Sequence, residues 1–160
     1  MTEFFGKYRG VVTDNRDPLL QGRLRATVED VFGEEECGWA LPCVPYAGNG
    51  VGFFMLPPVG AMIWVEFEHG DPDYPIWSGC FWAEGESPPP AQPETKVIKT
   101  DAGTILVDDT PGAGGITIET ANGMKIVLSE LGIEIDDGQG GSIKITGQTV
   151  SVNDGALEVT

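Results

Sequence analysis

The sequence reads KIVLSELGIEIDDGQGGSIKI from Lys125 to Ile145, and this stretch decides the fold of its second half. It contains three short triplets with an aliphatic residue at each end: Ile126–Leu128, Ile133–Ile135 and Ile143–Ile145. Glycine and aspartate fill most of the gaps, as expected for turns. Successive side chains of a strand point to opposite faces, so each triplet sends two aliphatic side chains to one face. The stretch therefore predicts a ladder of very short strands that share one apolar face.

The same pattern recurs through residues 94–160, with triplets starting roughly 7 to 11 residues apart. No segment there has the 3.6-residue period of a helix that could cover the apolar face. Full burial of one aliphatic side chain is worth about 1.5–3 kcal/mol, so exposure of the whole face would be costly. We therefore expect three chains to wind about one axis, pairing strands between chains and turning this face inward. A single-chain solenoid is the structural alternative.

The expected trimer core consists of the two outer aliphatic residues of each triplet. These are Ile105, Val107, Ile116, Ile118, Ile126, Leu128, Ile133, Ile135, Ile143, Ile145, Val150, Val152, Leu157 and Val159.

Residues 1–86 have a different pattern, with longer and less regularly spaced strand signals. In residues 62–68, Ile63, Val65 and Phe67 alternate with Trp64, Glu66 and Glu68 as in a half-buried strand. A Gly/Pro-rich loop without helical period occupies residues 45–60. Five strands in about 80 residues suit a small closed barrel of the oligonucleotide/oligosaccharide-binding (OB) type. The five predicted strands span residues 8–13, 23–28, 39–44, 62–68 and 74–82.

A proline-rich segment, residues 87–93, separates the two patterns. Closely spaced prolines favour an extended, semi-rigid linker over a packed element. We therefore predict a barrel domain over 1–86, a linker over 87–93 and a shaft over 94–160.

Charge excludes one class of function. The chain carries 9 basic and 25 acidic residues, a formal net charge of −16, and both halves are negative. Nucleic-acid binding needs a cationic surface, so we expect no nucleic-acid partner. The N-terminus has no signal-peptide pattern and no apolar run approaches the length that spans a bilayer. A soluble protein made in the cytoplasm is expected.

Candidate chemical groups are few. The three cysteines, Cys37, Cys43 and Cys80, lack the paired spacing of a zinc site and are interpreted as small buried hydrophobic residues. The single histidine, His69, has no second histidine with which to form a site and is assigned to the surface or a turn.

The acidic pairs Asp108-Asp109 and Asp136-Asp137 invite a hydrolase interpretation. Adjacent residues of a strand point to opposite faces, however, and Asp followed by Gly is typical of turns. The segment Asp136–Gly141 also has a weak similarity to calcium-binding glycine/aspartate repeats, but it occurs once and is interpreted as a turn. We expect no catalytic residue, no cofactor and no metal.

Residues 10–82 resemble the OB domain of phage baseplate central-spike proteins (baseplate assembly protein V) and of the VgrG spikes of type VI secretion. The most specific match is Gly70-Asp71-Pro72-Asp73-Tyr74-Pro75, followed by Gly79. Further matches precede it in the same order as in the family: Gly10-Val11-Val12, Asp17-Pro18, Gly22–Ala26, Trp39-Ala40, Pro45–Gly48 and Pro57–Phe67.

Thr104–Gly112 and Ile116–Thr120 look like the start of the family's triangular β-prism. The resemblance implies an all-β chain: an N-terminal five-stranded OB-fold barrel followed by a C-terminal intertwined trimeric triangular β-helix (β-prism).

The resemblance also implies a function. The chain would be the structural central spike of a contractile injection system, a non-enzymatic homotrimer that penetrates the target cell envelope. It would be assembled in the bacterial cytoplasm and reside in a virion tail baseplate or an equivalent particle. The alternative is an OB-fold glycan- or ligand-binding module on a trimeric stalk.

Departures from the family pattern imply further partners. Only about nine residues precede the barrel, whereas VgrG proteins carry a large N-terminal domain, so a separate baseplate hub protein would join the spike to the tail tube. No histidine follows His69, so the iron-binding tip of some short spikes is not expected here. A separate PAAR-like tip protein would then cap the shaft.

Overall fold

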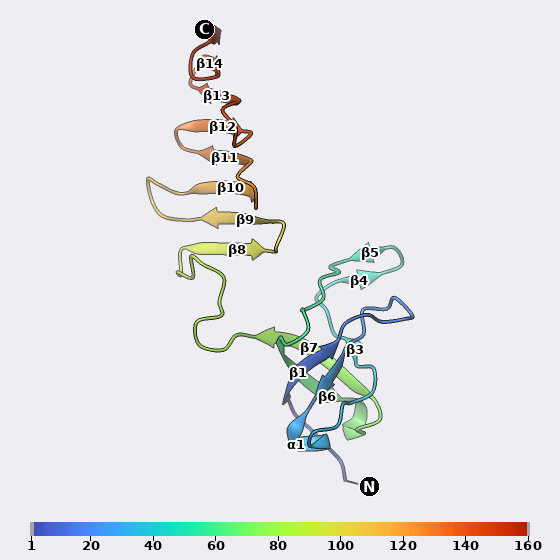
Figure 1. Ribbon diagram of the computed structural model, residues 1–160. Helices are drawn as coiled ribbons and strands as arrows, with labels where there is room; N and C mark the ends of the chain where they lie inside the picture. Colours follow the sequence, from blue (N-terminus) through green and yellow to red (C-terminus); the bar gives the residue numbers. More distant parts are fainter. Residues whose placement is uncertain (1, 160) are drawn as a thin grey trace. The chain divides into compact units, whose positions relative to one another are not determined.

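The computed structural model describes residues 2–159, which divide into two compact units, Met1–Glu86 and Ser87–Thr160 (Figure 1). Strands dominate both units. The helices among the described residues are one α-helical turn, α1 (Glu29–Phe32), and one 3₁₀ turn, Glu68–Gly70. Neither is long or apolar enough to cross a membrane.

The first unit is a curled five-stranded sheet with the strand order β2-β1-β6-β7-β3. Its two edges meet where Leu24, just before β2, forms an antiparallel bridge with Ala40, just before β3. The two residues exchange backbone hydrogen bonds of 3.1 and 2.8 Å, which closes the barrel and confirms the predicted OB-type fold. The strands are β1 (Tyr8–Asp14), β2 (Arg25–Thr27), β3 (Leu41–Pro42), β6 (Met62–Phe67) and β7 (Pro75–Phe81).

The barrel core follows the predicted alternation. On β6, Ile63, Val65 and Phe67 are buried, while the residues between them are half-buried. Leu24 and Val28 join them with no exposed surface. This core is what holds the first unit together, because burial of aliphatic surface is the main favourable contribution to folding.

The cysteines differ from expectation. Cys37 is buried, and burial raises the pKa of its thiol. Cys43 and Cys80 are exposed, so the prediction of three buried cysteines was wrong. Cys43 directly follows the two-residue strand β3. Cys80 lies beyond a register shift between β6 and β7, which an alternation rule applied to the sequence cannot anticipate. His69, at a positive φ of 54° and with its side chain 93% exposed, occupies a surface turn as expected.

The loop predicted over residues 45–60 contains a small hairpin, β4 (Ala47–Gly48) and β5 (Val51–Gly52), which the sequence did not predict. Its strands are two residues each, too short for a period-two pattern to be visible.

The second unit is one antiparallel sheet of eight strands in chain order, each paired with the next (Figure 1). All seven predicted triplets lie in its strands β9 to β15, and an unpredicted strand, β8, precedes them. Strands β9 to β14 have both hydrogen-bonded neighbours in the same chain, which differs from the expected pairing between chains. The strands are β8 (Thr95–Lys99), β9 (Gly103–Asp108), β10 (Gly115–Thr120), β11 (Lys125–Ser129), β12 (Gly132–Asp136), β13 (Ser142–Thr146), β14 (Thr149–Val152) and β15 (Leu157–Val159).

Replacing the buried Leu24 with alanine should lower the free energy of unfolding of the barrel by about 2–5 kcal/mol, because the substitution leaves a cavity in the core. The matched control Leu19→Ala removes the same atoms from a side chain that is 63% exposed, and should change stability by no more than about 0.5 kcal/mol. Tryptophan fluorescence during denaturant unfolding reports on this unit alone, since Trp39, Trp64, Trp77 and Trp82 all lie within it. Equal effects of the two variants would contradict the assigned core.

Candidate trimerisation site

Two columns of aliphatic side chains lie on one face of the sheet of the second unit, the first across β8 to β15 and the second across β9 to β15. The strand register places each member directly opposite the next. The first column is Ile98, Ile105, Ile118, Ile126, Ile135, Ile143, Val152 and Leu157. The second column is Val107, Ile116, Leu128, Ile133, Ile145, Val150 and Val159.

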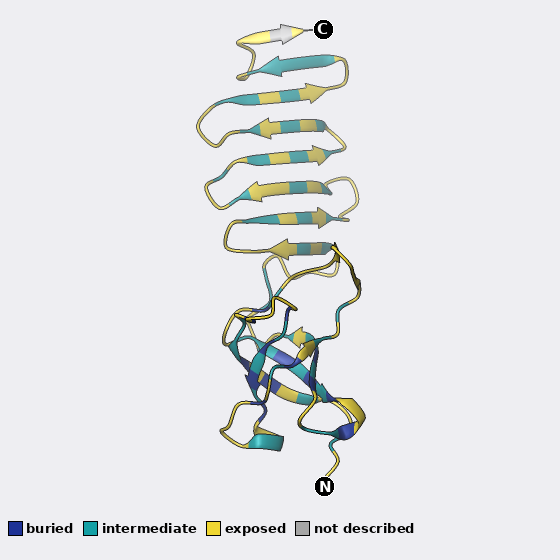
Figure 2. Cartoon of the chain, turned by 90° about the vertical axis from the view of Figure 1, so that its right-hand side faces the viewer, coloured by how far each residue is buried: buried dark blue, intermediate teal, exposed yellow. Residues whose placement is uncertain are grey.

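The structure thus brings the fourteen predicted aliphatic residues together on one face and adds Ile98. From β9 to β13 these side chains are 36–44% exposed, and the strands show alternating bands of exposed and intermediate residues (Figure 2). Within the second unit, none of the described residues forms a layer over this face. A continuous exposed aliphatic surface of this kind marks an interaction site.

The opposite face of the sheet is mixed and carries most of the ion pairs of this unit. Lys125 lies 3.8 Å from Glu134, and Lys144 lies 2.7 Å from Asp154. Thr117 and Ser151 occupy further positions on this face. Charged pairs of this kind are stable in water, so this face needs no partner.

Lys96 is the exception on the aliphatic face. It stands opposite Val107 at the start of the second column. Its ammonium group contacts the carboxylate of Asp109 and donates to the carbonyls of Pro93 (3.2 Å) and Glu94 (3.3 Å). Lys96 thereby ends the apolar column at β8. It also explains why the sequence did not reveal β8: in Thr95–Lys99 a lysine replaces one of the two aliphatic residues of a triplet.

The acidic pairs form turns. Asp108 accepts a hydrogen bond of 2.9 Å from the backbone N–H of Thr110. Asp137 accepts bonds of 2.7 and 2.8 Å from the N–H groups of Gln139 and Gly141, and these bonds hold the pKa of Asp137 below its ordinary value. A general acid needs a raised pKa. The environment of Asp137 therefore does not suit that role. Among residues 2–159, no three His, Cys, Asp or Glu side chains gather as metal ligands would.

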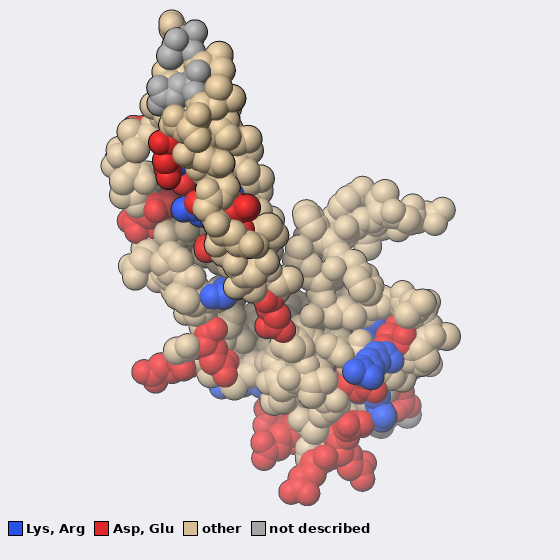
Figure 3. All heavy atoms as spheres, turned by 45° about the horizontal axis from the view of Figure 1, so that its top comes forward, with Lys and Arg blue, Asp and Glu red and all other residues tan. Residues whose placement is uncertain are grey.

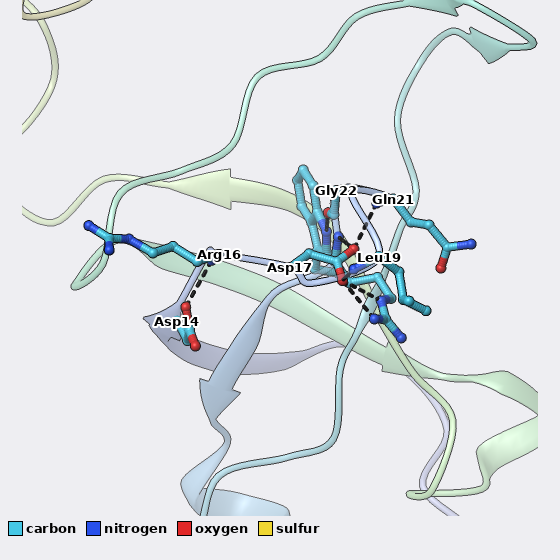
Figure 4. Close-up of polar contacts among 8 residues, drawn as sticks. Asp14, Arg16, Asp17, Leu19, Gln21 and Gly22 are labelled. Carbon is cyan, nitrogen blue, oxygen red and sulfur yellow. Dashed lines mark hydrogen bonds and ion pairs between the residues drawn. The ribbon is translucent and has the colours of Figure 1, made fainter.

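A buried ion pair organises the loop between β1 and β2 in the barrel (Figure 4). Asp17 is 6% exposed and accepts hydrogen bonds from Arg23 (Nη2, 2.6 Å; Nε, 3.1 Å) and from the N–H groups of Leu19 and Gln21. The indole N–H of Trp77 donates to the Gly22 carbonyl at 3.0 Å, which fastens the same loop to β7. The sequence showed Asp17 and Arg23 as family markers but gave no sign that they pair.

An aromatic group on the barrel is also explained by packing. Trp64 and Phe81 stack with ring centroids 4.6 Å apart. The Arg9 guanidinium lies 5.9 and 5.6 Å from the two centroids. Arg9 thus partners both rings, and the group does not form an open platform for a ligand.

Comparison with known families accounts for both units. Residues 8–82 match the type VI secretion system/phage-baseplate injector OB domain, and residues 95–158 match the phage baseplate V C-terminal trimerisation domain. The chain belongs to the phage baseplate V family. Members of this family are structural spike or baseplate proteins, and the second match covers the unit that bears the aliphatic columns.

Two curated relatives are proteins of much greater length. The chain is 37% identical over 65 residues to the type VI secretion system spike protein VgrG4b of Pseudomonas aeruginosa, and 35% identical over 71 residues to the actin cross-linking toxin VgrG1 of Vibrio cholerae. The matches cover 39% and 42% of this chain but only 8% and 6% of those proteins. The chain therefore spans less than a tenth of the length of these relatives.

The Asp17–Arg23 pair predicts a pH dependence of barrel stability. Hydrogen bonds from Arg23 and from backbone N–H groups hold the pKa of Asp17 well below its ordinary value of 3.8. Because the folded-state pKa is the lower one, the stabilisation is complete above about pH 4 and is lost as the pH falls below that value.

Asp17→Asn should therefore lower the unfolding midpoint at pH 7, and its difference from the unmodified chain should shrink below about pH 4. Asp73→Asn changes an exposed aspartate of the same unit and serves as the control, with no expected change in the profile. A difference that stays constant from pH 7 to pH 2 would show that Asp17 does not act through its charge.

Proposed function

We propose that three copies of the chain assemble through the two aliphatic columns, with three sheets facing one axis. The observation that carries this proposal is the continuous exposed aliphatic face on a unit that belongs to a trimerisation family. Three sheets around one axis would cover the face along its whole length. One sheet of such short strands has no second layer and cannot enclose a hydrophobic core by itself.

Burial of this face between copies is energetically favourable, and no charged side chain of the columns opposes it. From β9 to β13 each column residue still exposes about two fifths of its surface, and completing its burial contributes part of the 1.5–3 kcal/mol that full burial is worth, roughly 1 kcal/mol per residue. The net charge of −16 per chain opposes association in general, but the columns carry no charged side chain. The single charge at their end, Lys96, is neutralised by Asp109 of its own chain.

We further propose that this trimer is the central spike of a contractile injection apparatus and that it opens the target cell envelope when the sheath contracts. Eight strands at about 4.8 Å spacing give each shaft a length on the order of 35 Å. Continuous antiparallel pairing leaves no loose element in the sheet that could unfold under load. The particle would be a phage tail baseplate or its equivalent, assembled in the bacterial cytoplasm, with a separate hub protein and a PAAR-like tip protein as partners.

The substitution Ile118→Asp tests the trimer. Ile118 lies in the first column, and the charge would be buried three times per trimer. Loss of burial alone, at about 1 kcal/mol per copy, would weaken the trimer roughly a hundredfold. Thr117→Asp places the same charge on the opposite face of the same strand and should remain trimeric. Light scattering gives the mass of both variants. A trimeric Ile118→Asp protein would contradict the proposed core.

The spike role is tested in particles. Particles assembled without this chain, or with its Ile118→Asp variant, should not make target cells leak a cytoplasmic dye, whereas particles with Thr117→Asp should remain active. Normal leakage caused by particles that lack the chain would overturn the piercing role, whatever the oligomeric state of the protein.

A further inference from the structure

A second exposed apolar surface lies on the barrel, on the loop of residues 44–56 that contains the β4–β5 hairpin. We call it the apolar loop. Its large exposed side chains are Tyr46, Val51, Phe53, Phe54 and Met55, which are 52–69% exposed. Together with Leu20 they line a hollow of about 440 Å³. In Figure 3 the hairpin projects from the barrel without any charged side chain.

The apolar loop is held in one conformation by its own contacts. The Tyr46 carbonyl accepts a hydrogen bond from Phe53 N–H at 2.9 Å, and the two rings pack edge to face at 6.2 Å. Gly52 has a φ of 152°, and a Cβ there would lie 2.8 Å from the Tyr46 carbonyl oxygen, so only glycine fits. Phe54 lies over Gly22, the residue whose carbonyl binds Trp77.

This ordered loop is not explained by the barrel alone. A two-stranded hairpin of two residues per strand has little stability in water. Large apolar side chains gathered on an ordered projection are typical of a protein–protein contact, because a preformed surface loses little entropy on binding.

The distribution of charge indicates which partner covers it. No charged residue occurs from residue 37 to residue 65, whereas residues 1–86 as a whole carry 5 basic and 14 acidic side chains. Residues 87–94 connect each barrel to its trimerisation unit and span at most about 29 Å, at up to 3.6 Å per residue. Three barrels with the same negative charge are thus confined close together. Their uncharged surface is the one on which they can approach without repulsion.

We propose that the apolar loop of each chain packs against the barrel of a neighbouring copy in the trimer. This inference rests on the proposed trimer and adds a second interface, made by the barrels themselves. A threefold arrangement lets each loop bind the next barrel around the ring, so that all three loops are covered and the ring closes. The tether raises the effective concentration of the barrels, so even a small contact suffices.

Photo-crosslinking of the full-length chain tests this contact. p-Benzoylphenylalanine replaces Phe54 in one variant and Glu35, an exposed residue among acidic neighbours, in the control. Light scattering first establishes the mass of each variant. After irradiation, Phe54-labelled trimers should give covalent dimers and trimers on denaturing gels, with at least fivefold higher yield than Glu35-labelled trimers. Mass spectrometry should place the acceptor within residues 1–86 of another copy.

The proposal is overturned if Phe54-labelled trimers crosslink only within one chain, only to residues 95–159, or no more than the Glu35 control. In those cases the trimer itself stands and only the barrel contact fails. A monomeric chain under both labels would instead overturn the proposed trimer and this contact together.

Discussion

The second unit is subject to one constraint from which the rest of its behaviour follows: a single sheet cannot hide its own face. Strands β9 to β14 pair their backbones on both sides within the chain, so the main chain of these six strands needs no partner. The side chains of one face do need a partner, because this face consists of two aliphatic columns with Lys96 at one end. On the proposed assembly, other copies of the chain supply the missing layer, and folding of the shaft is then coupled to assembly.

The distribution of charged residues is consistent with this constraint. A chain at −16 repels its own copies, which helps solubility but opposes association. Both surfaces assigned to assembly, the aliphatic columns and the apolar loop, are almost free of charge. Where an ionised group does lie inside, as at Asp17, an arginine and several backbone donors satisfy it. In the proposed trimer, apolar contact determines where the copies meet, and the remaining acidic surface limits further association.

Much of the architecture could be predicted from the sequence, because period-two alternation depends on local residues. The alternation of Ile63, Val65 and Phe67 gave the core face of β6, and the aliphatic triplets gave seven strands and their common face. Features that depend on distant contacts could not be predicted. Strand β8 was hidden by Lys96, whose role depends on Asp109. The Asp17–Arg23 pair and the exposure of Cys80 depend on loop geometry and on a register shift. Within-chain pairing was missed because an aliphatic pattern shows which face is buried but not which strand is adjacent.

Sedimentation equilibrium of the unmodified full-length chain tests the central claim most directly, because burial of the aliphatic columns requires other copies. Across a range of concentrations the account predicts one species at three times the chain mass, with no detectable monomer down to the lowest concentration that absorbance can follow. A monomeric species that retains the strand signal in circular dichroism would show that the sheet is stable with its aliphatic face in water, and would contradict the account.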